Sequence, residues 1–174
     1  EFDHLAGSKK PTIYFDEEGV CDACRVAEAK GKTDWTQRKM ALQDLCDRHR
    51  SRSGDFDCIV PGSGGKDSFY ASHRLKEEFG MHPLTVTWAP HLPTEWGYRN
   101  FRRWNETASN ILYTPAVGVP RLLTRLSLEN LFHPFQPFII GQKNLAPKLA
   151  CLYDIPLVFY GENEAEYGNP KESN

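Results

Sequence analysis

Residues 58–80 read CIVPGSGGKDSFYASHRLKEEFG, and this stretch decides the fold of the 174-residue chain. The run from Cys58 to Val60 is short and apolar, which suits a buried strand. Glycine and serine follow and predict a tight turn. The segment from Lys66 then has the pattern of a helix that stops at Gly80. A strand, a tight turn and a helix in this order are the first half of a βαβ unit.

The rest of the chain repeats this alternation and predicts an α/β fold with a Rossmann-like parallel sheet. Helices are predicted over 33–50, 66–80, 95–109, 119–132 and 137–154, and strands over 56–60, 83–88, 110–114 and 155–163. Residues 1–34 are polar and rich in turn formers, so we expect a small appendage there.

Composition narrows the classes of function. Hydrophobic residues make up 40% of the chain, charged residues 25%, and the formal net charge is −2. These values are typical of a soluble globular protein and argue against nucleic acid as the main partner. No apolar run reaches the roughly 20 residues of a membrane span, so no membrane partner is expected. Five irregularly spaced cysteines and no export signal predict reduced thiols in a cytoplasmic protein.

The glycine turn matches neither of the two common phosphate signatures. A Walker loop requires glycine at position 60 and Ser or Thr after Lys66, but the residues there are Val60 and Asp67. The dinucleotide fingerprint G-x-G-x-x-G also requires a glycine where Asp67 stands.

The residues of the turn still favour an anion. Gly64 and Gly65 allow the backbone to bend and approach a ligand closely, and successive amide groups there form a concave nest. The following helix adds positive potential at its first turn. Ser63 and Ser68 add hydroxyl donors, and Lys66 adds an ammonium group.

SGGKDS after an apolar strand resembles the pyrophosphate loop (PP-loop) of the N-type ATP pyrophosphatases. This superfamily includes GMP and NAD synthetases, tRNA thiolases, tRNA-lysidine synthetase and sulfonucleotide reductases, and has the adenine nucleotide alpha-hydrolase fold. The resemblance implies that the loop grips the β- and γ-phosphates of ATP while a substrate attacks the α-phosphorus. It assigns the phosphates to Ser63, Gly64, Gly65, Lys66, Asp67 and Ser68, and the adenosine to the surroundings of Thr87.

Five longer segments resemble one branch of this superfamily, the N-acetyl sugar amidotransferases of lipopolysaccharide and O-antigen biosynthesis. They are YFDEEGVCDAC (14–24), DFDCIVPGSGGKDS (55–68), GMHPLTVTWAP (80–90), WGYRNF (96–101) and IPLVFYGENEAEYG (155–168). The likeness implies conversion of the acetamido group of a nucleotide-activated sugar to an acetamidino group, with ammonia supplied by a separate glutaminase. Two alternatives stay open: a tRNA thiolase or related RNA-modifying enzyme, and a nucleotide-binding fragment that is inactive alone.

Residues inside and outside the loop are candidates for catalysis and for substrate binding. Lys66, Asp67 and Glu162 are the candidate catalytic residues, and both carboxylates are candidate Mg²⁺ ligands. Candidate substrate-binding residues are Arg99, Asn100, Gly161 and Asn163. For Glu162 the alternative is a solvated carboxylate at a strand end. For Arg99 it is a solvated helix face, which is the favoured interpretation.

Cys21 and Cys24 have the spacing of zinc ligands, but two thiolates do not complete a tetrahedral site. Cys58 and Cys151 lie in apolar runs, so we expect inert core residues. The predicted division is an appendage over 1–53, which includes the CxxC segment and an N-terminal tag, and a PP-loop ATP-binding domain over 54–174. We expect that domain to continue beyond the end of this chain.

Overall fold

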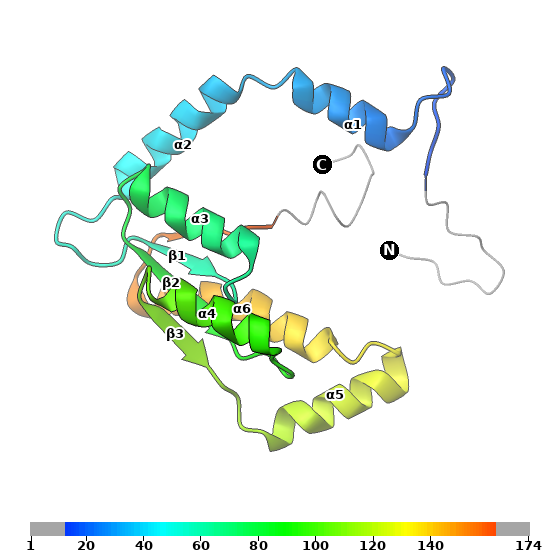
Figure 1. Cartoon of the computed structure of the whole chain (residues 1–174), viewed down its shortest axis with the longest axis vertical. Helices are drawn as coiled ribbons and strands as arrows, with labels where there is room; N and C mark the ends of the chain where they lie inside the picture. The colour runs from blue at the N-terminus through cyan, green and yellow to red at the C-terminus, as the bar shows by residue number, and fades with distance from the viewer. Residues whose placement is uncertain (1–12, 163–174) are drawn as a thin grey trace. The chain divides into compact units, whose positions relative to one another are not determined.

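A computed structural model describes residues 13–162 and confirms the α/β fold with a parallel sheet (Figure 1). In chain order the elements are α1 (Asp22–Gly31), α2 (Trp35–His49), β1 (Cys58–Pro61), α3 (Lys66–Glu77), β2 (Pro83–Trp88), α4 (Glu95–Asn105), β3 (Asn110–Tyr113), α5 (Gly118–Leu131), α6 (Gln136–Tyr153) and β4 (Leu157–Val158). Every helix and strand predicted after residue 33 is present.

The sheet has the strand order β3-β2-β1-β4, and all three strand pairs are parallel. Cys58 lies opposite Pro83 and Leu157, and Thr85 lies opposite Asn110. Because the strands run the same way, their carboxyl ends share one edge of the sheet. Ligands of open α/β sheets bind at this edge, and the glycine turn follows β1 there.

Helices cover both faces of the sheet (Figure 1). On one face, β1 packs with α3, α4 and the second half of α2; the buried residues of this cluster are Cys46, Cys58, Val60, Leu75, Phe79, Met81 and Trp104. On the other face, β1 and β2 pack against α6; the buried residues there are Ile59, Leu84, Val86, Leu145, Ala146, Leu149 and Ile155. Both faces of β1 are therefore buried from solvent, as its continuous apolar sequence requires.

The described residues divide into two compact units, one over 13–40 and one over 41–162, with the division inside α2. The second unit contains the sheet. No helix within residues 13–162 is long and apolar enough to cross a membrane.

Three local predictions were wrong. The polar segment before residue 34 contains the helix α1, although none of its residues is buried. The strand predicted over 155–163 is only two residues long, and the chain then bends at Gly161 and Glu162. Cys151 is exposed, because it lies on the solvent side of α6, whereas Cys58 is buried as predicted.

Candidate functional site

The glycine turn joins β1 to α3 at the carboxyl edge of the sheet. The backbone N–H of Gly62 donates a hydrogen bond to the carbonyl oxygen of Val86 at 3.0 Å, which anchors the turn to β2. Gly65 is the N-cap residue of α3 and has no side chain to cap the helix. The amide groups of this first turn therefore meet no side-chain oxygen from the N-cap position, an arrangement suited to an anion.

Two independent constraints require glycine at position 64. Its φ angle is +82°, in the left-handed region. A Cβ at this position would lie 2.8 Å from the Cα of Phe101 and 2.9 Å from the carbonyl carbon and oxygen of Asn100. The loop thus lies directly on the backbone of α4. The structure thereby brings together Gly64 and Asn100, two residues predicted separately for the site.

Gly161 makes a similar contact from the other side. A Cβ there would lie 2.7 Å from the carbonyl carbon of Asp67, 2.8 Å from its oxygen and 2.9 Å from the nitrogen of Ser68. The segment after β4 therefore touches the first turn of α3. Glu162 is the next residue and is exposed. Asn163 lies outside the described residues.

The polar side chains of the loop differ in their surroundings. Lys66 Nζ lies 2.7 Å from Asp67 Oδ1, and the two side chains are 85% and 37% exposed, so both are accessible to a ligand. Ser63 is exposed. Ser68 is buried, and its hydroxyl donates to the carbonyl oxygen of Gly65 at 3.2 Å. The structure therefore gives Ser68 a role in shaping the turn, beside its predicted role in binding.

Thr87, the residue predicted to lie near adenosine, is buried near the end of β2. Its hydroxyl accepts a hydrogen bond from the Asn110 side-chain amide at 3.2 Å, and Thr85 accepts from the same amide at 2.9 Å. A ligand at this place would meet the edge of the sheet rather than a projecting hydroxyl. Asn110 was not predicted from the sequence. The one feature that could have pointed to it is that a polar amide residue stands at the first position of the strand β3.

Arg99 forms contacts within α4. Its Nη2 lies 2.6 Å from Oε1 of Glu95, four residues earlier, and its guanidinium carbon is 4.9 Å from the ring centre of Trp96. Its side chain is 57% exposed. These contacts agree with a solvated helix face, and such a pair is readily broken because exposed ion pairs are weak. Its role in binding substrate stays a prediction.

The cysteine pair lies at the start of α1, where Cys21 is the N-cap residue. Hydrogen bonding from the backbone N–H of Cys24 lowers the pKa of the Cys21 thiol, while hydrogen bonding to Cys21 raises that of Cys24. Among residues 13–162, no cluster of three or more His, Cys, Asp or Glu side chains is placed to hold a metal ion. Cys46 is buried in the core. Zinc therefore stays an untested prediction.

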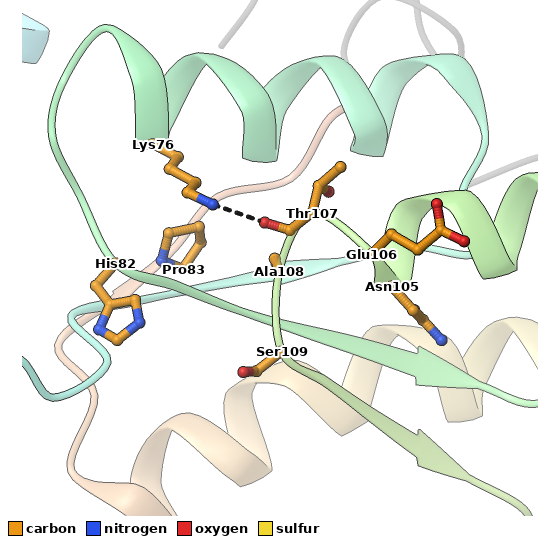
Figure 2. Close-up of a pocket in the computed structure, with 8 residues that line it drawn as sticks. All are labelled: Lys76, His82, Pro83, Asn105, Glu106, Thr107, Ala108 and Ser109. Carbon is orange, nitrogen blue, oxygen red and sulfur yellow. Dashed lines mark hydrogen bonds between the residues drawn. The ribbon is translucent and has the colours of Figure 1, made fainter.

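A separate surface pocket of about 390 Å³ lies at the opposite edge of the sheet, where β2 and β3 begin (Figure 2). Its lining includes Lys76, His82 and Glu106. Lys76 already donates a hydrogen bond to the Thr107 carbonyl oxygen at 2.9 Å, and His82 Nδ1 lies 2.7 Å from the Gly54 carbonyl oxygen. These groups join segments of the fold, so we place the functional site at the carboxyl edge.

The fold matches that of a solved enzyme. An NH3-dependent NAD synthetase from Campylobacter jejuni, solved in complex with a nitrate ion, superposes with a TM-score of 0.54 at 14% sequence identity. The match covers 78% of this chain and 59% of that chain. At this level of identity the likeness concerns the fold alone, because one fold supports many functions.

Sequence comparison gives a shorter match. An uncharacterized protein of Methanocaldococcus jannaschii is 30% identical over 83 residues, which is 48% of this chain and 29% of that protein. No protein-family model matches the chain. The chain therefore spans less than two thirds of both relatives. What the comparisons establish is an α/β sheet domain with the fold of an NAD synthetase.

Proposed function

We propose that this chain binds ATP at the glycine turn and forms the nucleotide-binding part of an ATP pyrophosphatase that adenylates an acceptor. The observation that carries the proposal is the packing of Gly64. Gly64 is left-handed, and a Cβ added to it would lie within 3 Å of the α4 backbone, so the turn is fixed in one shape beside the first turn of α3. Such a preformed nest suits phosphate, and NAD synthetases belong to the superfamily that SGGKDS resembles.

Different residues of the site bind different parts of ATP. The loop amides and the Lys66 ammonium face the two outer phosphates, and the backbone around Thr87 meets the adenosine. Asp67 and Glu162 provide oxygen ligands of the kind that Mg²⁺ prefers, since Gly161 holds the Glu162 segment against Asp67. Mg²⁺ would neutralise charge on the leaving pyrophosphate. Lys66 does the same from the protein side, which makes it a catalytic residue.

The proposed acceptor is the acetamido group of a nucleotide-activated sugar. Its amide oxygen attacks the α-phosphorus of ATP, the bond to the bridging oxygen breaks, and pyrophosphate leaves. Ammonia then adds to the activated carbon, AMP departs with the former amide oxygen, and loss of a proton gives the amidine. The five segments quoted above support this acceptor, and the structural neighbour is itself an ammonia-dependent enzyme by name.

Partners follow from this chemistry. Arg99 and Asn100 on α4, together with Gly161 and Asn163 after β4, are the proposed contacts for the sugar nucleotide. A separate glutaminase would supply ammonia, and both nucleotide substrates are available in the cytoplasm. The net charge of −2 makes an RNA substrate the weaker candidate.

The test is to incubate the protein with ATP, Mg²⁺, ¹⁵N-ammonium and one of two acceptors, a UDP-linked diacetamido sugar or tRNA. We expect AMP and pyrophosphate only with the sugar, and ¹⁵N in the sugar by mass spectrometry. The Lys66→Ala variant is the control and should form neither product. Product formation only with tRNA would replace the sugar by RNA as the acceptor, and ¹⁵N-free sugar would refute the amidine product.

A further inference from the structure

We infer that Trp104 is a positioning residue for the phosphate loop: from α4, it holds the loop and the first turn of α3 in the shape that grips the outer phosphates. This inference rests on the proposed function, because it concerns how the same site distinguishes a triphosphate from a monophosphate. Trp104 is far from the loop in sequence and has no place in any of the motifs discussed above.

A chain of hydrogen bonds runs from the buried Trp104 to the N-cap of α3. The Trp104 side chain is fully buried, and its Nε1–H donates to the Ser72 hydroxyl at 2.8 Å. That hydroxyl donates to the carbonyl oxygen of Phe69 at 3.0 Å. The Phe69 N–H donates to the carbonyl oxygen of Gly65 at 3.0 Å. Each group in the chain therefore orients the next, and the last one is in the loop.

The indole also lies close to the loop itself. A Cβ on Gly62 would lie 3.1 Å from an indole carbon of Trp104 and 2.2 Å from the Cβ of Ser68. Earlier on the same helix, Asn100 and Phe101 press against Gly64. α4 thus touches the loop at two points and, through Trp104, also binds Ser72 in the middle of α3. A shift of this helix would move the loop amides together.

Loss of the hydrogen-bond chain should weaken the binding of the β- and γ-phosphates, which the loop holds. Ser72→Ala keeps the indole in place and removes the link, and Trp104→Phe removes the donor but keeps an aromatic ring. A net hydrogen bond contributes a factor of roughly 2 to 12 to an equilibrium. We therefore expect each variant to bind ATP about 5-fold more weakly than the wild type, while AMP affinity stays unchanged, because AMP lacks the outer phosphates.

The experiment measures ATP and AMP affinities by calorimetry for the wild-type chain, both variants and Leu149→Ala. Leu149 is a buried residue of α6, on the opposite face of the sheet, so its truncation lowers stability without touching α4. We expect the ratio of ATP to AMP affinity to fall in Ser72→Ala and Trp104→Phe and to stay at the wild-type value in Leu149→Ala.

Two results overturn the inference: an unchanged ratio in Ser72→Ala, or an equal fall in Leu149→Ala, which would mean that any loss of stability disturbs the loop. Failure of the proposed function has a different signature. In that case the wild-type chain itself would bind ATP no better than AMP.

Discussion

Replacement of Gly64 by alanine tests whether the loop has the shape described here. Two costs add. The left-handed φ of +82° costs an alanine roughly 1–2 kcal/mol. The new Cβ would also lie 2.8–2.9 Å from α4 backbone atoms, which cannot rotate away, and such overpacking costs about 1–3 kcal/mol. The free energy of unfolding should therefore fall by about 2–5 kcal/mol, and ATP binding should be lost.

Gly54→Ala is the matched control. Gly54 has a similar left-handed φ of +87°, but an added Cβ there meets nothing within 4 Å. It should incur only the conformational cost of roughly 1–2 kcal/mol and leave ATP binding intact. The assay is urea unfolding followed by circular dichroism, with ATP affinity measured on the folded protein. If both variants lost the same stability, the contact between the loop and α4 would be refuted.

The remaining predictions concern the side chains around the loop and the cysteine pair. Lys66→Ala and Asp67→Ala should each reduce pyrophosphate release by orders of magnitude with the unfolding midpoint unchanged, since both side chains are accessible; normal release in both would contradict their assignment. Gly161→Ala should weaken ATP binding, because its Cβ would press on the Asp67 carbonyl; wild-type affinity would count against that contact. Iodoacetamide should modify Cys21 faster than Cys24 as the pH approaches the ordinary thiol pKa from below, because the pKa is lowered at Cys21 and raised at Cys24. Peptide mass spectrometry measures this order, and equal rates in urea are the required control.

The sequence predicted those parts of the fold that depend on buried apolar patterns. Two strands and one helix have enough hydrophobic residues on their buried sides for the sequence pattern to reveal them. They are the strands around Ile59 and Val86 and the helix that contains Leu75. α1 was missed because it buries nothing: it depends on alanine, lysine and glutamate propensity, which leaves no stripe of apolar residues.

For the candidate site, the loop could be predicted because its glycines are adjacent in sequence. The contact between Gly64 and Asn100 and that between Gly161 and Asp67 could not be derived from pattern alone, since each depends on how separate elements pack. The same holds for Trp104. Its burial could be guessed from its type, but its partner Ser72 lies 32 residues earlier, and a serine within a helix gives no sign of such a role.

We propose that the turn after β1 holds the two outer phosphates of ATP. The most direct measurement is a crystal structure of the chain with α,β-methylene-ATP and Mg²⁺, in which the bond to the α-phosphorus cannot be cleaved. We expect the β- and γ-phosphates within about 3 Å of the amides of Gly64 and Gly65, with the α-phosphorus open to an acceptor. Phosphates bound elsewhere, such as in the pocket beside Lys76, with the glycine turn empty at saturating nucleotide, would contradict it.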